Sequence, residues 1–297
     1  MSASASTSQM SSALAIMRRM PPNKIEQNLS GLINLLPEQT DELLQRVDQP
    51  LEEATCLRTG RRFLLCDYNR DGDSYRSPWS NEYDPPLSDG FTPTDSLRAM
   101  EVDANTLYDS YREQYYEGGV SSVYLWDLAV GFAGCFLVKK CVQGHASVTE
   151  GSWDSIHVVE AVEASDGASA TYKLTSTVML TMDVNKTSLD SNLSGCMVRQ
   201  KEVELPVTEV KPHIVNIGCM IEDMEIDMRS SMDNLYIQKS REIVNSMRKV
   251  SRGPQQGHLF TADLSAVVKA RASVSGGSSG GGVPTEAATD DDIRATI

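Results

Sequence analysis

The segment YKLTSTVMLTM, residues 172–182, alternates apolar and polar side chains with a period of two. Leu174, Val178 and Leu180 share one side of an extended chain, and Thr175 and Thr177 share the other. Successive side chains of a β-strand point to opposite faces of its sheet. The pattern therefore predicts a strand with one apolar face.

Neighbouring segments continue this pattern on the N-terminal side. Residues 121–126 and 132–140 flank Gly131 and predict a hairpin, and residues 153–163 carry apolar side chains on one face. Consecutive strands joined by short turns indicate an antiparallel sheet with one covered face. We assign residues 61–206 to a loop followed by this sheet, with a helix inserted at about residues 96–114.

Helical patterns precede and follow the sheet. Residues 10–60 predict a stalk of three short antiparallel helices, with Pro22 and Pro37 opening the second and third. Residues 1–9 are rich in Ser and Ala and are expected to be disordered. The fold class is therefore α+β.

The longest helical pattern lies at residues 207–252. From Ile214 to Leu235 apolar residues recur every three or four positions, and no Pro interrupts residues 213–250. A helix of that length spans roughly 55 Å at 1.5 Å per residue. It needs an extended surface to cover, which is either the sheet or a partner. Its methionines are interpreted as core filler.

The C-terminal region predicts one more helix, at residues 258–272, before a Gly/Ser-rich and acidic tail at 273–297 that is expected to be disordered. A helix this short is marginal alone in water. It either docks on the rest of the chain or binds a groove on a partner, and the pattern leaves both open.

Composition excludes several classes of protein. The 297 residues carry 27 basic and 41 acidic side chains, a net charge of −14, which argues against nucleic-acid binding. Six scattered cysteines form no zinc or redox motif. We find neither a signal peptide nor an apolar run long enough to span a bilayer, and we expect a cytosolic, non-transmembrane protein.

The run LLCDYNRDGDSYRSPWSNEYDPPL, residues 64–87, resembles a calcium-binding loop. Asp67, Asn69, Asp71 and Gly72 match positions 1, 3, 5 and 6 of an EF-hand, but position 12 is Pro78 instead of Glu. The better interpretation is a tight turn held by side-chain-to-backbone hydrogen bonds. Neither a metal nor another cofactor is expected.

No catalytic motif is found. The sequence lacks a nucleophile elbow, a P-loop and a zinc-protease helix. His157 and His213 are interpreted as structural, and Asp127 and Asp154 as hydrogen-bonding residues at turns or strand edges. An enzyme is therefore not expected.

Eight segments together resemble one family, the β subunit of the F-actin-capping protein heterodimer (CapZ type). They are MRRMPPNKIEQNLSGLINLLP (17–37), VDQPL (47–51), LLCDYNRDGDSYRSPWSNEYDPPL (64–87), YEGGVSSVYLWDL (116–128), GFAG (131–134), WDSIHVVE (153–160), YKLTSTVML (172–180), and PHIVNIG with IEDME (212–225). They occur in the family's order and cover about residues 10–250.

The resemblance implies a fold and a function. The sheet would join that of an α subunit, so this chain would be neither stable nor functional alone. The heterodimer would bind the barbed end of actin filaments, without calcium, and block subunit exchange. Residues 258–272 would form a mobile actin-binding helix, called the tentacle. Its contact residues would be Leu259, Phe260, Leu264, Val267, Val268, Lys269 and Arg271.

The resemblance also implies regulators. Arg19 and Tyr83 fall at positions where peptides with a capping-protein-interaction motif would bind. Acidic phosphoinositides would be further ligands, to which this acidic chain would contribute weakly. An alternative function is a structural subunit that caps an actin-related filament in a larger complex such as dynactin. A calcium-regulated enzyme or sensor is the third hypothesis, and it predicts measurable heat of calcium binding.

Overall fold

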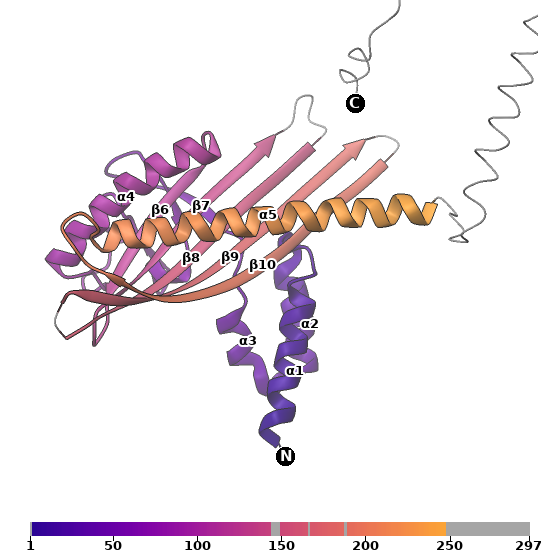
Figure 1. Ribbon diagram of the computed structural model, residues 1–297, viewed down its shortest axis with the longest axis horizontal. Coiled ribbons are helices and arrows are strands. Elements are labelled where there is room, and N and C mark those ends of the chain that lie inside the picture. The colour runs from indigo at the N-terminus through magenta and orange to yellow at the C-terminus, as the bar shows by residue number, and fades with distance from the viewer. Residues whose placement is uncertain (1, 144–148, 166, 187–188, 248–297) are drawn as a thin grey trace, which may run out of the picture. The chain divides into compact units, whose positions relative to one another are not determined.

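The computed structural model describes residues 2–143, 149–165, 167–186 and 189–247. Its centre is a five-stranded antiparallel sheet with the order β10-β9-β8-β7-β6 (Figure 1). The strands are β6 (Val120–Asp127), β7 (Phe132–Gln143), β8 (Thr149–Glu163), β9 (Ser169–Lys186) and β10 (Leu189–Pro206). The predicted antiparallel sheet is therefore confirmed.

Gly131 closes the hairpin between β6 and β7. Its φ of +84° lies in the left-handed region, and a Cβ at this position would stand 2.0 Å from the backbone oxygen of Ala161. Only glycine satisfies both conditions. The bulge-free register that follows pairs Asp127 with Phe132 and Val120 with Lys139.

The fifth strand is absent from the sequence prediction. β10 pairs with β9 from Leu189↔Lys186 to Pro206↔Ser169. Its sequence lacks a regular apolar alternation, since residues 199–204 read RQKEVE. Most of these side chains are exposed, and charged side chains are common on strands at the edge of a sheet.

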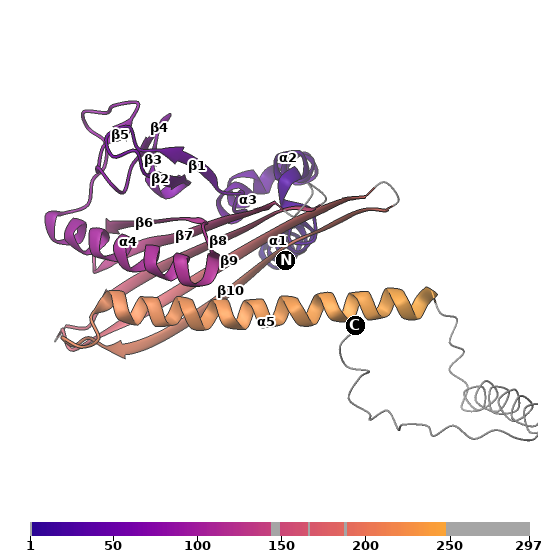
Figure 2. The same cartoon turned by 90° about the horizontal axis from the view of Figure 1, so that it is seen from above.

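Two helices cover one face of the sheet (Figure 2). They are α4 (Asp95–Tyr116) and the N-terminal part of α5 (His213–Met247). The chain divides into two units after Asp233, and the packing of α5 described here concerns the residues up to that point. Both predicted helices are present, and α4 lies on the same face of the sheet as α5.

The opposite face is covered as well, which corrects the expectation of one covered face. The hairpin of β1 (Glu52–Thr55) and β2 (Arg62–Leu65) packs there. Leu51 and Leu64 join Tyr124 and Leu137 of the sheet in one buried cluster. Ser122 accepts a hydrogen bond from the Leu64 N–H at 2.9 Å, and Tyr124 donates to the Leu64 carbonyl at 2.6 Å.

The predicted N-terminal stalk consists of three helices and two 3-10 turns. The elements are α1 (Ser2–Met17), η1 (Pro22–Lys24), α2 (Ile25–Leu35), η2 (Pro37–Gln39) and α3 (Thr40–Arg46). Both prolines occupy the first position of their turns, as predicted. A small core of Met10, Ala13, Met17, Leu29, Leu32 and Leu43 holds the helices together.

Two predicted boundaries of the stalk differ from the structure. Residues 2–9 belong to α1 and are helical. The helical region ends at Arg46 and not near residue 60. Pro50 favours extended backbone before it, and β1 follows directly.

The calcium-like run forms turns and short strands. They are η3 (Asp67–Asn69), β3 (Arg70–Asp71), β4 (Ser74–Arg76) and β5 (Tyr83–Asp84). Gly72, with φ of +59°, lies in the two-residue turn between β3 and β4. Asn69 accepts a hydrogen bond from the Cys66 N–H and donates one to the Arg76 carbonyl, both at 2.9 Å. Asn69, which would be the metal ligand at position 3 of the loop, therefore uses its side chain for hydrogen bonds to the backbone.

Candidate functional site

The free edge of β10 is the first feature that a partner could use. This strand is 18 residues long and ends the sheet, so its outer side has no strand neighbour among the described residues. Such an edge presents N–H and C=O groups that can pair with a strand from a second chain, although the N–H of Cys196 donates to the Arg18 carbonyl at 3.2 Å. The other end of the sheet, β6, is only 8 residues long and is bordered by α4.

The long helix α5 buries one stripe of side chains against the sheet. The buried side chains recur every three or four residues: Asn216, Ile217, Met220, Ile221, Met224, Glu225, Met228 and Met232. This confirms that the methionines fill the core. On the outer side Ile226 remains 54% exposed. In the second unit, residues 234–247, the exposed apolar side chains are Leu235, Ile237 and Val244.

Glu225 breaks the apolar stripe and is nevertheless only 1% exposed. Tyr116 and Tyr111 of α4 donate hydrogen bonds to its carboxylate, the second at 2.9 Å, and Nε2 of His157 on β8 lies 3.1 Å from it. Nδ1 of the same imidazole lies 2.8 Å from the hydroxyl of Ser176 on β9. One carboxylate therefore joins α5 to α4 and, through His157, to two central strands.

The electrostatics of this network favour the ionised carboxylate. Burial alone would raise the pKa of Glu225. The hydrogen bond and charge of His157, together with hydrogen bonds from Tyr116 and Ser155, instead lower this pKa to about 2. The guanidinium of Arg229 lies 3.4 Å from the same carboxylate, and its carbon is 4.7 Å from the Tyr116 ring centre and 5.1 Å from that of Trp153. Burial and these contacts fix the orientation of α5.

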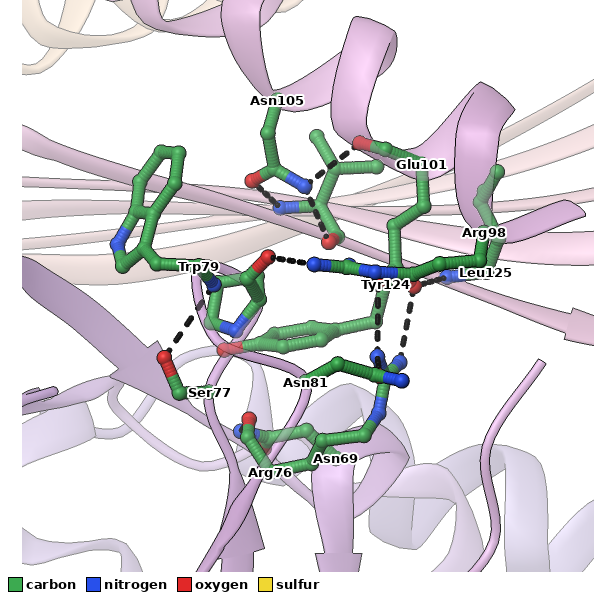
Figure 3. A network of polar contacts seen from close by, with 12 residues as sticks. Asn69, Arg76, Ser77, Trp79, Asn81, Arg98, Glu101, Asn105, Tyr124 and Leu125 are labelled. Atoms are coloured by element: carbon green, nitrogen blue, oxygen red, sulfur yellow. Dashed lines mark hydrogen bonds and ion pairs between the residues drawn. The ribbon is translucent and has the colours of Figure 1, made fainter. Parts of the chain in front are cut away.

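The loop between β2 and α4 is held by a second buried charge (Figure 3). Arg76 donates two hydrogen bonds of 2.8 Å to the carboxylate of Glu101, whose side chain is fully buried. Arg98 also binds this carboxylate, and the N–H of Leu125 on β6 donates to it at 2.6 Å. Asn81 accepts a further bond from Arg76 at 2.7 Å. Arg76 is thus a structural residue and is not available as part of a partner surface.

The predicted regulator residues lie on different elements. Arg19 is exposed just after α1, and Tyr83 is half-buried in β5, where its hydroxyl donates to the Phe91 carbonyl at 2.8 Å. Tyr83 lines a pocket of about 210 Å³ together with Cys56 and Phe63. Within the described part of the chain, no hydrogen bond or ion pair joins Arg19 to Tyr83.

The predicted actin-binding residues lie outside the described residues. This applies to Leu259, Phe260, Leu264, Val267, Val268, Lys269 and Arg271. Their placement therefore stays a prediction, as does that of the tail at 273–297.

Sequence reasoning missed the two buried glutamates. Both aspartates form hydrogen bonds, as predicted, but only Asp127 lies at a strand end, whereas Asp154 is buried inside β8. Asp154 accepts bonds from the Leu51 N–H and from Lys139, and Asp127 binds the Thr94 N–H and hydroxyl at the start of α4. A usable signal for Glu225 was present, because it follows Ile221 by four residues and so falls on the apolar stripe.

Across the described ranges, no group of three or more His, Cys, Asp or Glu side chains is placed to hold a metal ion. The helices within residues 2–247 include none with the length and apolarity that crossing a bilayer requires.

Comparison with known proteins identifies relatives over almost the whole described region. The family model for "F-actin capping protein, beta subunit" matches residues 10–244. The F-actin-capping protein subunit beta of Drosophila melanogaster is 50% identical over 266 residues, covering 89% of this chain and 96% of that protein. The Caenorhabditis elegans protein of the same name is 49% identical over 246 residues, covering 82% and 90%.

Two further matches bear the same kind of name. The Aspergillus fumigatus F-actin-capping protein subunit beta is 50% identical over 241 residues, covering 81% of this chain and 74% of that protein. A solved actin capping protein alpha subunit from Plasmodium berghei, described as homodimeric, has a TM-score of 0.49 and 16% identity, covering 82% and 96%. On the match over residues 10–244 and the identity of about one half to the relatives, the chain belongs to the F-actin capping protein beta subunit family.

Proposed function

We propose that this chain is the β half of a heterodimer that binds the barbed end of actin filaments and blocks the gain and loss of subunits there. It is a binding protein without catalytic chemistry. It works in the cytoplasm as part of the cytoskeleton. The relatives are named for F-actin capping, which favours this role over that of a subunit in a complex such as dynactin.

The observation that carries the proposal is the free edge of β10. An 18-residue antiparallel strand without an outer neighbour, in the described structure, is a template for pairing with another chain. Pairing with an α subunit there would extend the sheet across both chains. Burial of this edge in the heterodimer would explain why the protein tolerates such a long edge strand.

The proposed mechanism combines a rigid body with a second attachment point. The body would block the filament end sterically, while the tentacle at residues 258–272 binds the hydrophobic cleft of a terminal actin subunit. Phe260, Leu264, Val267 and Val268 would form the apolar side of this helix, and Lys269 and Arg271 would lie near its C-terminus. Two linked attachments raise the effective concentration and slow dissociation.

Regulation is the finer part of the proposal. Arg19 and Tyr83 would contact peptides with a capping-protein-interaction motif, and the exposure of the first and the pocket beside the second support this. Acidic phosphoinositides would act mainly through the α subunit, since this chain carries a net charge of −14.

The test is co-expression with an α subunit, followed by elongation assays on actin filaments with free barbed ends. We expect the dimer to stop elongation, and Leu264→Asp to weaken capping because it places a charge on the apolar face of the tentacle. Ser265→Asp, on the opposite face, is the matched control. A dimer that leaves elongation unchanged contradicts the capping function. Equal capping by both variants contradicts only the tentacle assignment.

A further inference from the structure

A groove between α4 and α5 has no role in the fold described so far. It encloses about 240 Å³, and its lining is mostly apolar, with Leu107 and Tyr111 from α4, Phe136 from β7 and Val215 from α5. Leu107 is 54% exposed and Val215 is 38% exposed, so the rim keeps apolar surface in contact with water. An apolar groove between two helices is suited to receive a side chain from another protein.

Gly218 lines this groove, and no contact among the described residues requires a glycine at this position. Glycine is the poorest helix former apart from proline, and Gly218 lies inside α5. A Cβ added at this position would meet nothing within 4 Å, so packing among the described residues does not require glycine. Its small size instead leaves room for another molecule to approach the helix backbone.

Tyr108 also lines the groove and contributes a buried polar atom. The residue is 6% exposed, and its hydroxyl has no hydrogen-bond partner among the described residues. Buried hydroxyls in proteins are almost always paired. The wall of the groove therefore contains one polar atom that the described residues leave unsatisfied.

Charge and position narrow the choice of occupant. Glu222 lines the groove, accepts a hydrogen bond from Tyr115 at 2.6 Å and retains free lone pairs. Residues 213–228 contain no Lys or Arg, so this part of the rim is acidic. The groove lies over β7, which β8 and β9 separate from the edge strand β10. A chain that pairs at β10 is therefore not the natural occupant.

We propose that this groove is a contact for the filament end. It takes an apolar side chain from an actin segment that carries a Lys or Arg beside it. The apolar side chain packs over Gly218 between Leu107 and Val215, and the cation lies near Glu222. This inference rests on the capping function proposed above and adds a contact in the body to that of the tentacle.

The test fills the groove without disturbing the fold. Gly218→Leu places a side chain in the open space and replaces glycine with a good helix former, so we expect the heterodimer to melt about 2–4 °C higher. Capping should weaken about thirty-fold, the amount that corresponds to losing one buried aliphatic side chain. Ser230→Leu, an exposed position on α5 away from the groove, is the matched control.

The readouts are the melting temperature of the dimer, the yield of intact dimer, and the dissociation constant for barbed ends from elongation rates. Capping that weakens for Gly218→Leu and is unchanged for Ser230→Leu supports the proposal. Normal capping by Gly218→Leu overturns it and leaves the capping function standing. Loss of the α subunit from the Gly218→Leu dimer also overturns it, because the occupant is then the α subunit. A wild-type dimer that does not cap overturns both.

Discussion

Replacing Glu225 by Gln should destabilise the protein, because several hydrogen-bond donors point at the charged carboxylate that the substitution removes. The amide has nearly the shape of the carboxylate, so packing under α5 is preserved. The hydroxyls of Tyr111 and Tyr116 and the ring of His157 lose the anion to which they point. The change therefore tests whether the ionised carboxylate, and not the filled volume, holds α5 on the sheet.

The magnitude follows from the pKa. A fall in the pKa from 4.5, the ordinary value of a glutamate, to about 2 in the folded protein corresponds to about 3 kcal/mol at pH 7. Because the folded pKa lies below the unfolded one, this stabilisation is fully present above about pH 4.5. It is lost as the pH falls from 4.5 towards 2. At pH 3 roughly 1.5 kcal/mol should remain.

The assay is urea unfolding of the co-expressed dimer at fixed protein concentration, at pH 7 and at several values down to pH 3. The difference between wild type and Glu225→Gln should be about 3 kcal/mol at pH 7 and should shrink through the acid range. Asp227→Asn, exposed on the same helix, should change stability by less than about 0.5 kcal/mol. A Glu225→Gln protein as stable as that control at pH 7, or a pH-independent difference, would refute the reasoning.

Two other substitutions give comparably direct tests. Arg76→Met leaves Glu101 buried with one cation fewer and should cost about 3–5 kcal/mol by urea unfolding, whereas adding Glu101→Leu should recover much of the loss. If the double variant is no more stable than Arg76→Met, lost packing and not the unpaired charge accounts for the destabilisation. Gly131→Ala should cost more than about 1 kcal/mol, because its Cβ would collide with backbone at a positive φ. Gly60→Ala is the matched control, because Gly60 also has a positive φ, +70°, but has open space around it. If both variants lower the melting temperature equally, the predicted collision at Gly131 does not contribute.

Local periodicity made the central elements predictable. The strands β6 to β9 and the helices α4 and α5 each repeat apolar residues with the period of their own structure, and Gly131 marks a turn that only glycine can make. Such signals lie within 10 to 20 consecutive residues and need no knowledge of what packs against them.

The elements that sequence reasoning missed depend on contacts between distant residues. β10 is an edge strand whose residues 199–204 are mostly polar and exposed, so they show no regular alternation of apolar and polar side chains. The second covered face arises because Leu64 and Leu51 share a cluster with Tyr124, which lies about 60 and about 70 residues further along the chain. The proposed tentacle at residues 258–272 has a clear apolar pattern, but it lies outside the described residues and its proposed partner is another protein, so its position stays a prediction.

The two buried glutamates each hold one element of the protein in a fixed position. Glu101 fixes the loop that carries Tyr83, and Glu225 fixes the helix that borders the α4–α5 groove. An apolar core could match their stability, since buried charges are costly to desolvate. A carboxylate with several directed hydrogen bonds, however, accepts one arrangement, while apolar side chains tolerate small shifts. We infer that these charges set the positions of this loop and of α5. In the Arg76→Met, Glu101→Leu double variant, hydrogen exchange in residues 67–91 should therefore rise even where stability recovers, and unchanged exchange would show that packing alone positions the loop.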